Sequence, residues 1–252
     1  MKQGMPDDQA QRLTVKRGLL APLVLFASQT MVGVGLSVGA NSIRDANVGE
    51  AVIDVQVIGV ISALTGGVLA LLWVWTDIRK FGPLFAQQLG LRPSVNGAKQ
   101  TALTVIALLI ATHLMAWTYR SVLLPLAGQG GIVGGGSQMF AHLSESGSAY
   151  GMALFMVLAL IAGPVFEEVV YRGYLQSALT RRLPRWGAIT ITSLVFMAGH
   201  GPPVLWPMYF VFSAAWGWVF ARTGSLKAAI AFHILNNLFY TVIAVTGWNI
   251  LA

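Results

Sequence analysis

Long apolar segments separated by short polar ones recur along the whole chain. The segments lie at residues 19–39, 55–76, 101–119, 150–180, 186–201, 204–221 and 227–247. Most hold about 20 residues, the number that a helix rising about 1.5 Å per residue needs to cross a hydrocarbon layer of about 30 Å. Their apolar residues are continuous rather than alternating, which favours helices over the strands of a barrel. The pattern predicts an all-α, polytopic transmembrane helical bundle with about seven membrane helices.

Composition points the same way. Of 252 residues, 56% are hydrophobic and 10% are charged, whereas a typical soluble domain has about 25% charged residues. The absence of cysteine excludes disulfides, thiolate ligands and a thiol nucleophile. Without an internal repeat, the chain is expected to form one integral membrane domain over residues 1–252.

Lysine and arginine are unevenly distributed among the connections. If the N-terminus is cytoplasmic, 14 of the 16 basic residues fall in cytoplasmic stretches, and only Arg44 and Arg120 fall outside. The 14 are Lys2, Arg12, Lys16, Arg17, Arg79, Lys80, Arg92, Lys99, Arg172, Arg181, Arg182, Arg185, Arg222 and Lys227. Because cytoplasmic loops are enriched in Lys and Arg, this predicts a cytoplasmic N-terminus and an external C-terminus, in a cell inner membrane. The same topology explains the net charge of +7, so no nucleic-acid partner is expected.

Two adjacent acidic residues, Glu167 and Glu168, interrupt the fourth apolar segment. A carboxylate within a membrane costs about 2.5–3.5 kcal/mol on insertion scales, which makes it a functional-site candidate. Glu168 and Arg172 are four residues apart and are expected to pair on one helix face. Glu167, about 100° round the helix, is then the acid without a cation, and it is the candidate general base. The alternative is that both acids mark a helix end at the membrane surface.

The fourth segment is too long for one straight crossing. A helix over residues 150–181 would measure nearly 48 Å at about 1.5 Å per residue. Gly163-Pro164 is the predicted break, because proline lacks an N–H and clashes with the preceding turn. A second helix beginning at Pro164 would direct its positive end at Glu167. Glu167, His200 and His233 are also expected to lie within the membrane, below the basic helix ends on the cytoplasmic side. Both features favour a water-filled cavity reached from the cytoplasm.

Two of the last three apolar segments carry the remaining polar candidates. His200 ends one segment, in the sequence Phe-Met-Ala-Gly-His. His233 and Asn237 are four residues apart on the last segment, with Asn236 beside them, so they should face the bundle interior rather than lipid. An interhelical hydrogen bond without catalysis would explain them as well. His113 is expected to be structural, and His142, near Glu145 in a glycine-rich connection, is expected to face water.

These residues, in this order, resemble a known signature. Glu167-Glu168-Val-Val-Tyr-Arg172, then Phe196-x-x-x-His200, then His233-x-x-x-Asn237, is similar to the three motifs of the CAAX prenyl protease and bacteriocin-processing (CPBP, or Abi) family. The matching, motif-bearing core spans about residues 150–240. The resemblance implies an intramembrane endopeptidase that hydrolyses peptide bonds of a membrane-associated or transmembrane peptide or protein, with membrane lipid around it.

The resemblance also implies roles for individual residues. Glu167 and His200 would bind or deprotonate the attacking water, and His233 and Asn237 would polarise the scissile carbonyl and stabilise its oxyanion. Glu168 and Arg172 would hold the geometry. Members of the family are described both as metalloproteases and as metal-free glutamate-dependent enzymes, so Glu167, His200 and His233 are also candidate ligands of a divalent metal such as Zn²⁺. Some members serve in bacteriocin self-immunity, so a non-enzymatic peptide-binding protein is the alternative function.

Overall fold

The computed structural model describes residues 13–45, 54–80, 87 and 89–246. Every regular element in these ranges is helical. Six helical stretches are long and apolar enough to cross a membrane: Val15–Ser42, Val55–Ile78, Ala98–Leu126, Ala149–Leu179, Pro203–Thr223 and Leu226–Thr246. The shorter apolar helix Arg185–Ala198 occupies the place of the remaining predicted segment. The prediction of an all-α polytopic bundle with about seven membrane helices is confirmed.

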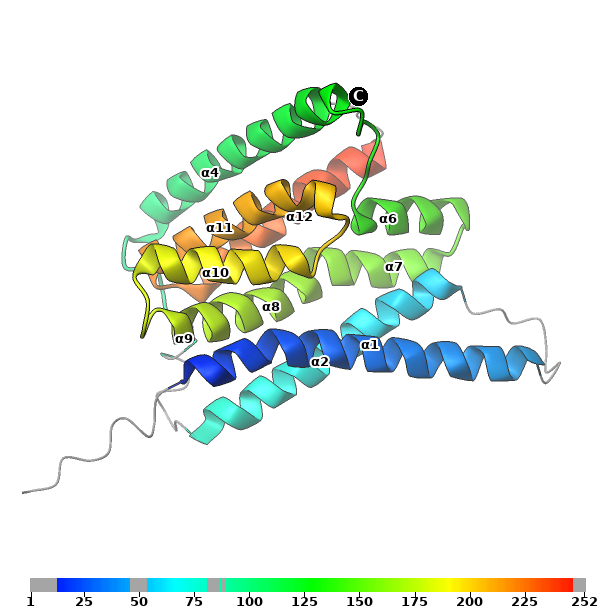
Figure 1. Cartoon of the computed structure of the whole chain (residues 1–252), viewed down its shortest axis with the longest axis horizontal. Helices are drawn as coiled ribbons and strands as arrows, with labels where there is room; N and C mark the ends of the chain where they lie inside the picture. The colour runs from blue at the N-terminus through cyan, green and yellow to red at the C-terminus, as the bar shows by residue number, and fades with distance from the viewer. Residues whose placement is uncertain (1–12, 46–53, 81–86, 88, 247–252) are drawn as a thin grey trace, which may run out of the picture.

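Successive long helices run in opposite directions through the bundle (Figure 1). In chain order they are α1 (Val15–Asp45), α2 (Val55–Ile78), α4 (Ala98–Thr118), the composite helix of α7 to α9, α10 (Arg185–Ala198), α11 (Trp206–Thr223) and α12 (Leu226–Thr246). A further short helix, α6 (Gly135–Glu145), lies at one end of the bundle, next to the start of α7.

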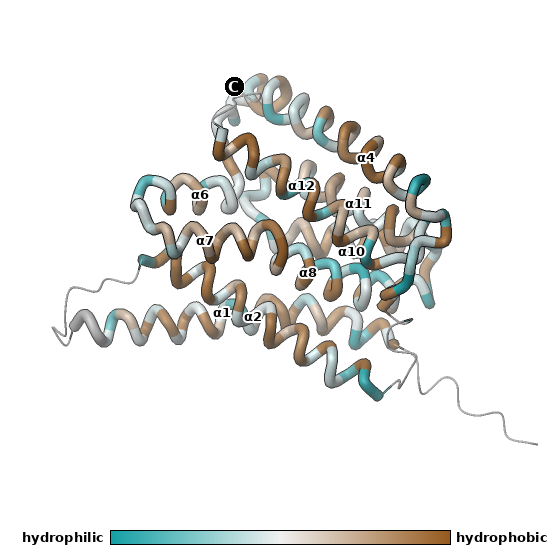
Figure 2. The backbone as a smooth tube through the Cα atoms, turned by 180° about the vertical axis from the view of Figure 1, so that it is seen from behind, coloured by the Kyte–Doolittle hydropathy of each residue, from teal (hydrophilic) through white to brown (hydrophobic). Residues whose placement is uncertain are grey.

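The outer surface of the bundle is apolar, as lipid requires. Large side chains on α1 are widely exposed, with Leu23 at 62%, Phe26 at 64% and Met31 at 74% of their maximal area. Figure 2 shows hydrophobic residues along most of the helix lengths, with hydrophilic residues mainly toward the helix ends. A surface of this kind is stable in a bilayer and not in water, so the chain is an integral, multi-pass membrane protein.

The fourth crossing is one continuous helix, and the predicted break at Gly163-Pro164 is wrong. It comprises α7 (Ala149–Val157), the π-helical segment η3 (Leu158–Ala162), α8 (Gly163–Glu168), a second π-helical segment η4 (Val169–Gln176) and α9 (Ser177–Leu179). Proline disrupts an α-helix because its ring clashes with the preceding turn. The wider turn of η3, which ends two residues before Pro164, accommodates the ring without interrupting the helix. No second helix therefore begins at Pro164.

α10 is shorter than the predicted segment 186–201. Its 14 residues measure about 21 Å at about 1.5 Å per residue, less than the thickness of the hydrocarbon layer. The helix ends at Ala198, with Gly199 as its C-cap, so that His200 lies in the turn that leads to α11. η5 (Pro203–Leu205) then leads directly into α11. The short helix thus holds a histidine inside the bundle rather than at its surface.

Glycines allow close helix crossings beside the motif helix. A Cβ atom on Gly66 of α2 would lie 2.5 Å from the backbone nitrogen of Gln29 on α1, and one on Gly67 would lie 2.0 Å from the ring of Phe166. Ser28 of α1 donates a hydrogen bond to the Gly66 carbonyl oxygen at 2.8 Å. α2 therefore lies directly against the residue that precedes Glu167.

Polar contacts also join η4 to α11. Arg172 bonds Ser213, and Gln176 Nε2 donates to the Gly217 carbonyl oxygen at 2.8 Å. Both pairs are separated by 41 residues, so the two helices run in the same direction, with α10 returning between them. The two contacts set the position of α11 along the motif helix.

Candidate active site

Glu168 and Arg172 form a buried ion pair next to Glu167. Arg172 Nη1 donates to Glu168 Oε1 at 2.9 Å, and neither side chain has any exposed area. Arg172 Nη2 donates to the carbonyl oxygen of Ser213 at 2.8 Å and to its hydroxyl at 2.6 Å. Buried charges are stable only when they are paired and hydrogen-bonded. The pair expected from helical spacing is present, and its complete burial places Glu168 in the packed interior of the bundle.

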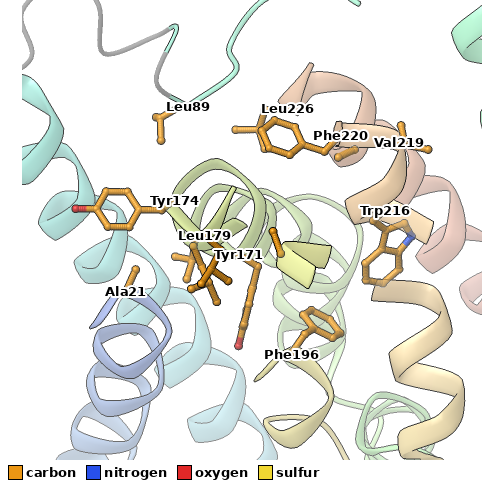
Figure 3. Packing of buried hydrophobic residues seen from close by; sticks show 14 of the residues in the cluster. Ala21, Leu89, Tyr171, Tyr174, Leu179, Phe196, Trp216, Val219, Phe220 and Leu226 are labelled. Atoms are coloured by element: carbon orange, nitrogen blue, oxygen red, sulfur yellow. The ribbon is translucent and has the colours of Figure 1, made fainter. Parts of the chain in front are cut away.

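Two aromatic rings hold both the arginine and the histidines. The guanidinium carbon of Arg172 lies 5.2 Å from the ring centroids of both Phe196 and Trp216. The His200 ring stacks on Phe196 at 3.9 Å, and the His233 ring stacks on Trp216 at 3.7 Å. Figure 3 shows Phe196 and Trp216, which come from α10 and α11, in one region of the core. This packing restricts the orientation of both imidazoles.

Glu167 faces both histidines. Its Oε1 lies 3.8 Å from His200 Nε2, and its Oε2 lies 3.7 Å from His233 Nε2. These distances are longer than direct hydrogen bonds. The Glu167 side chain keeps 25% of its area exposed, whereas that of Glu168 keeps none. The three side chains therefore converge on one point, as the sequence indicated, although Glu167 is not without basic neighbours.

Hydrogen bonds on the far side of each imidazole determine which nitrogen faces Glu167. His233 Nδ1 lies 2.9 Å from Glu168 Oε1, and His200 Nδ1 lies 2.6 Å from the Phe196 carbonyl oxygen. Both partners are acceptors, so each Nδ1 carries the proton and donates it. In a neutral imidazole the Nε2 atom is then an acceptor, and two such atoms point toward the Glu167 carboxylate. The point where they meet requires a hydrogen-bond donor.

The charges of the cluster are unequal. It holds two carboxylates, Glu167 and Glu168, against the single cation Arg172. His233 contacts both glutamates and is only 3% exposed, so it links the two acids.

Asn237 has a contact that the resemblance did not imply. Its Nδ2 donates to the Ala159 carbonyl oxygen at 2.8 Å. Ala159 lies in η3, where residue 163 donates to the carbonyl of residue 158. The equivalent donor to Ala159 would be the nitrogen of Pro164, which has no hydrogen. Asn237 thus supplies the missing hydrogen bond and joins α12 to the turn before Glu167. This is an interhelical hydrogen bond of the kind that the non-catalytic alternative for this residue predicted.

The three converging side chains line a cavity of about 590 Å³. Its wall includes Phe155, Phe166, Met208, Phe212 and Tyr240, so it is largely apolar around a small polar centre. Pockets of this size and character bind organic ligands. Gln29 and Ala63 also line a smaller cavity of about 430 Å³ between α1 and α2. The lining residues Gly136 and Ser137 belong to the start of α6. The expected access from the cytoplasm stays a prediction.

The metal expectation is not supported. Protein ligands lie about 2.0–2.2 Å from a Zn²⁺ ion, and the ion needs several of them around one point. Within the described ranges, no group of three or more His, Cys, Asp or Glu side chains is arranged to hold a metal ion.

The other histidines lie outside the site. His113 stacks on Tyr240 at 5.2 Å, and its Nδ1 bonds the Leu109 carbonyl oxygen, which agrees with a structural role. His142 is half-exposed, but it also bonds Asp54 at 3.0 Å, a contact that the sequence did not suggest. Asp54 caps α2 by accepting the Gln56 N–H, and this hydrogen bond lowers the pKa of its carboxyl group.

Sequence reasoning missed several residues of the site. Ser213 and Trp216 lie in the apolar segment 204–221, where neither residue stands out from its neighbours as a site candidate. Their spacing of three residues on one helix face becomes informative only when Arg172 lies against that face. Arg120 and Tyr209, which line the cavity, were likewise not identified as site residues.

The fold and the site define a class of protein: a multi-pass helical membrane protein with a glutamate and two histidines converging on a cavity inside the bundle. Residues 149–239 match the family model described as "Type II CAAX prenyl endopeptidase Rce1-like". The matched segment is close to the predicted core 150–240, so this part of the chain is similar to CAAX prenyl endopeptidases, in agreement with the resemblance drawn from the motifs. Comparisons with curated proteins and with solved structures gave no significant match.

Proposed function

We propose that the chain hydrolyses peptide bonds of a membrane-associated or transmembrane peptide, using a water molecule activated by Glu167. The observation that carries this proposal is the convergence of both Glu167 oxygens with the Nε2 atoms of His200 and His233, at 3.7–3.8 Å. A water molecule at this point can donate its O–H groups to Glu167 and to His200 Nε2. Its oxygen would then lie next to the apolar cavity in which a peptide can bind.

The reaction follows from these positions. Glu167 removes a proton from the water, and the oxygen attacks the scissile carbonyl carbon, forming a tetrahedral intermediate. Protonated Glu167 then transfers that proton to the leaving nitrogen as the C–N bond breaks. The products are a new carboxylate and a new amine, and Glu167 is regenerated. General acid–base catalysis of this kind contributes about 10²–10⁴-fold to a rate.

His233 is the proposed oxyanion donor. With its Nδ1–H bonded to Glu168 and a proton on Nε2, it presents a charge-assisted donor beside Glu167. His200, held by the Phe196 carbonyl, orients the water. Asn237 acts mainly as a positioning residue, because its amide holds η3, the turn that precedes Glu167.

Replacing Glu167 separates this proposal from a non-enzymatic peptide-binding or self-immunity function. Membrane proteomes would be compared for a deletion strain and for strains that carry the parent chain, Glu167→Gln or Glu145→Gln. Glu145 is an exposed acid outside the site and serves as the control. We expect Glu167→Gln to reproduce the uncleaved proteins of the deletion strain, with cleavage reduced at least about 100-fold. Glu145→Gln should behave like the parent.

Two outcomes would contradict this mechanism. Unchanged processing in Glu167→Gln would favour a binding function, because a neutral glutamine cannot act as the base. Loss of processing in washed membranes after addition of a chelator, with recovery on adding Zn²⁺, would show that a metal activates the water.

A further inference from the structure

One polar side chain in the wall of the catalytic cavity has an unused atom. Asn236 of α12 lines the cavity and is only 4% exposed. Its amide nitrogen, Nδ2, donates to Asn237 Oδ1 at 3.2 Å. Its amide oxygen, Oδ1, is buried and has no hydrogen-bond partner among the described residues. A buried acceptor without a partner is costly, so a molecule bound in the cavity is expected to supply the donor.

The neighbouring amide determines that the unused atom is the oxygen. The Ala159 carbonyl oxygen can only accept, so Asn237 has to turn its Nδ2 toward it, at 2.8 Å. The Asn237 Oδ1 that remains is also an acceptor, and Asn236 meets it with its own Nδ2. This chain of amides has one direction, which is fixed by the carbonyl that Pro164 leaves without a donor. It leaves an acceptor, and not a donor, on Asn236.

Asn236 lies next to the proposed reacting groups. It follows His233 by three residues on α12, a spacing at which side chains are neighbours, with Cβ atoms about 5–6 Å apart. His233 Nε2 in turn lies 3.7 Å from Glu167 Oε2. An extended peptide advances about 3.3–3.6 Å per residue. A peptide group bonded to Asn236 therefore lies within about two residues of a peptide bond held at Glu167 and His233.

An acceptor at this position selects one kind of partner. The scissile carbonyl and its oxyanion are themselves acceptors, so Asn236 Oδ1 cannot stabilise them. The donor that a peptide carries at almost every residue, whatever its side chains, is the backbone N–H. Proline is the exception, because its nitrogen has no hydrogen. The same wall includes Phe155 and Tyr240, which can pack against apolar side chains beside such a backbone contact.

We infer that Asn236 Oδ1 accepts a hydrogen bond from a backbone N–H of the substrate, within two residues of the scissile bond, and thereby excludes proline at that position. That the bound molecule is a peptide rests on the proposed function. Asn236 takes no part in proton transfer. It holds the peptide chain in register with Glu167, and its own orientation is set by Asn237.

The test removes the donor from a peptide and the acceptor from the protein in turn. The probe is a lauroyl-capped tetrapeptide amide of alternating alanine and leucine. It is compared with a series of analogues, in each of which one backbone N–H is replaced by an ester oxygen of similar size. Binding to the full chain carrying Glu167→Gln, which removes the proposed base, is titrated in detergent through the rise in melting temperature.

One ester analogue should bind about tenfold more weakly than the all-amide peptide, because it leaves the buried Oδ1 unsatisfied. When Asn236→Leu is added, all analogues should bind alike, within about twofold. Asn236→Ala gives the same comparison if the leucine variant does not fold. Thr241→Val replaces another polar residue of this wall and is the matched control, in which the tenfold difference should remain. A purely structural role of Asn236 would weaken amide and ester equally.

Three results would overturn the inference. Equal binding of every ester analogue to the Glu167→Gln protein would mean that a water molecule satisfies Asn236. A tenfold difference that persists in Asn236→Leu would assign the N–H to another acceptor. If no peptide of the series binds, the cavity does not hold a peptide backbone in this way.

Binding is measured without turnover, so the two proposals can fail separately. If the ester effect depends on Asn236 but Glu167→Gln leaves the membrane proteome unchanged, the peptide contact stands and the peptidase proposal fails. If Glu167→Gln abolishes cleavage but no ester effect depends on Asn236, the peptidase stands and this inference fails.

Discussion

The buried Glu168–Arg172 pair should control whether the bundle is stable. Substituting Glu168→Gln preserves volume but leaves the Arg172 cation with only neutral partners, the carbonyl and hydroxyl of Ser213. Arg172→Met removes the cation and leaves the Glu168 carboxylate with His233 as its remaining partner. Breaking a buried pair typically costs about 3–5 kcal/mol, because the other charge is stranded. We expect each single variant to lose about that much.

The double variant should lose less than the sum of the two single losses. With both charges removed, neither side chain is left as an uncompensated ion, and partners in direct contact show coupling energies of about 0.5–3 kcal/mol. His233 would still lose its acceptor in the double variant, so full recovery is not expected. The exposed Arg222→Met is the control for loss of a cation and should change stability by no more than about 0.5 kcal/mol.

The assay is unfolding in detergent, with free energies of unfolding for the parent, both single variants, the double variant and the control. Glu167→Gln belongs in the same series, because Glu167 is partly exposed and should be dispensable for stability. Two results would refute the reasoning. One is a Glu168→Gln protein as stable as the parent, and the other is a double variant whose loss equals the sum of the single losses. If Glu167→Gln unfolds early while Glu168→Gln is stable but inactive, the two roles are reversed.

Two further predictions concern the helices around Glu167. Gly67→Ala should lower stability and cleavage, since its Cβ would lie 2.0 Å from the Phe166 ring, whereas Gly35→Ala, which meets nothing within 4 Å, should not; thermal unfolding and the proteome comparison measure both. Asn237→Leu should cost about 1–3 kcal/mol by leaving the Ala159 carbonyl unsatisfied. The cost should be smaller in a Pro164→Ala background, where residue 164 regains an N–H; an equal cost in both backgrounds would show that Asn237 does not compensate for the proline.

The sequence alone determined the membrane bundle and much of the site. Segments of about 20 apolar residues can satisfy their backbone in lipid only as helices. The spacing of Glu168 and Arg172 on one helix is local, so it indicated their pair without knowledge of the fold. The motif order Glu167, His200, His233 likewise identified the side chains that converge. The family match over residues 149–239 covers all three.

The tertiary structure decided what depends on neighbouring helices. Pro164 signals a break locally, but Asn237, more than 70 residues away, satisfies the carbonyl that the proline leaves open, so the helix continues. Trp216 becomes part of the site only because α11 lies parallel to η4, which brings its ring against Arg172 and His233. Depth along single helices likewise does not show which residues pack in the core, such as Leu226, and which line a cavity, such as Tyr240.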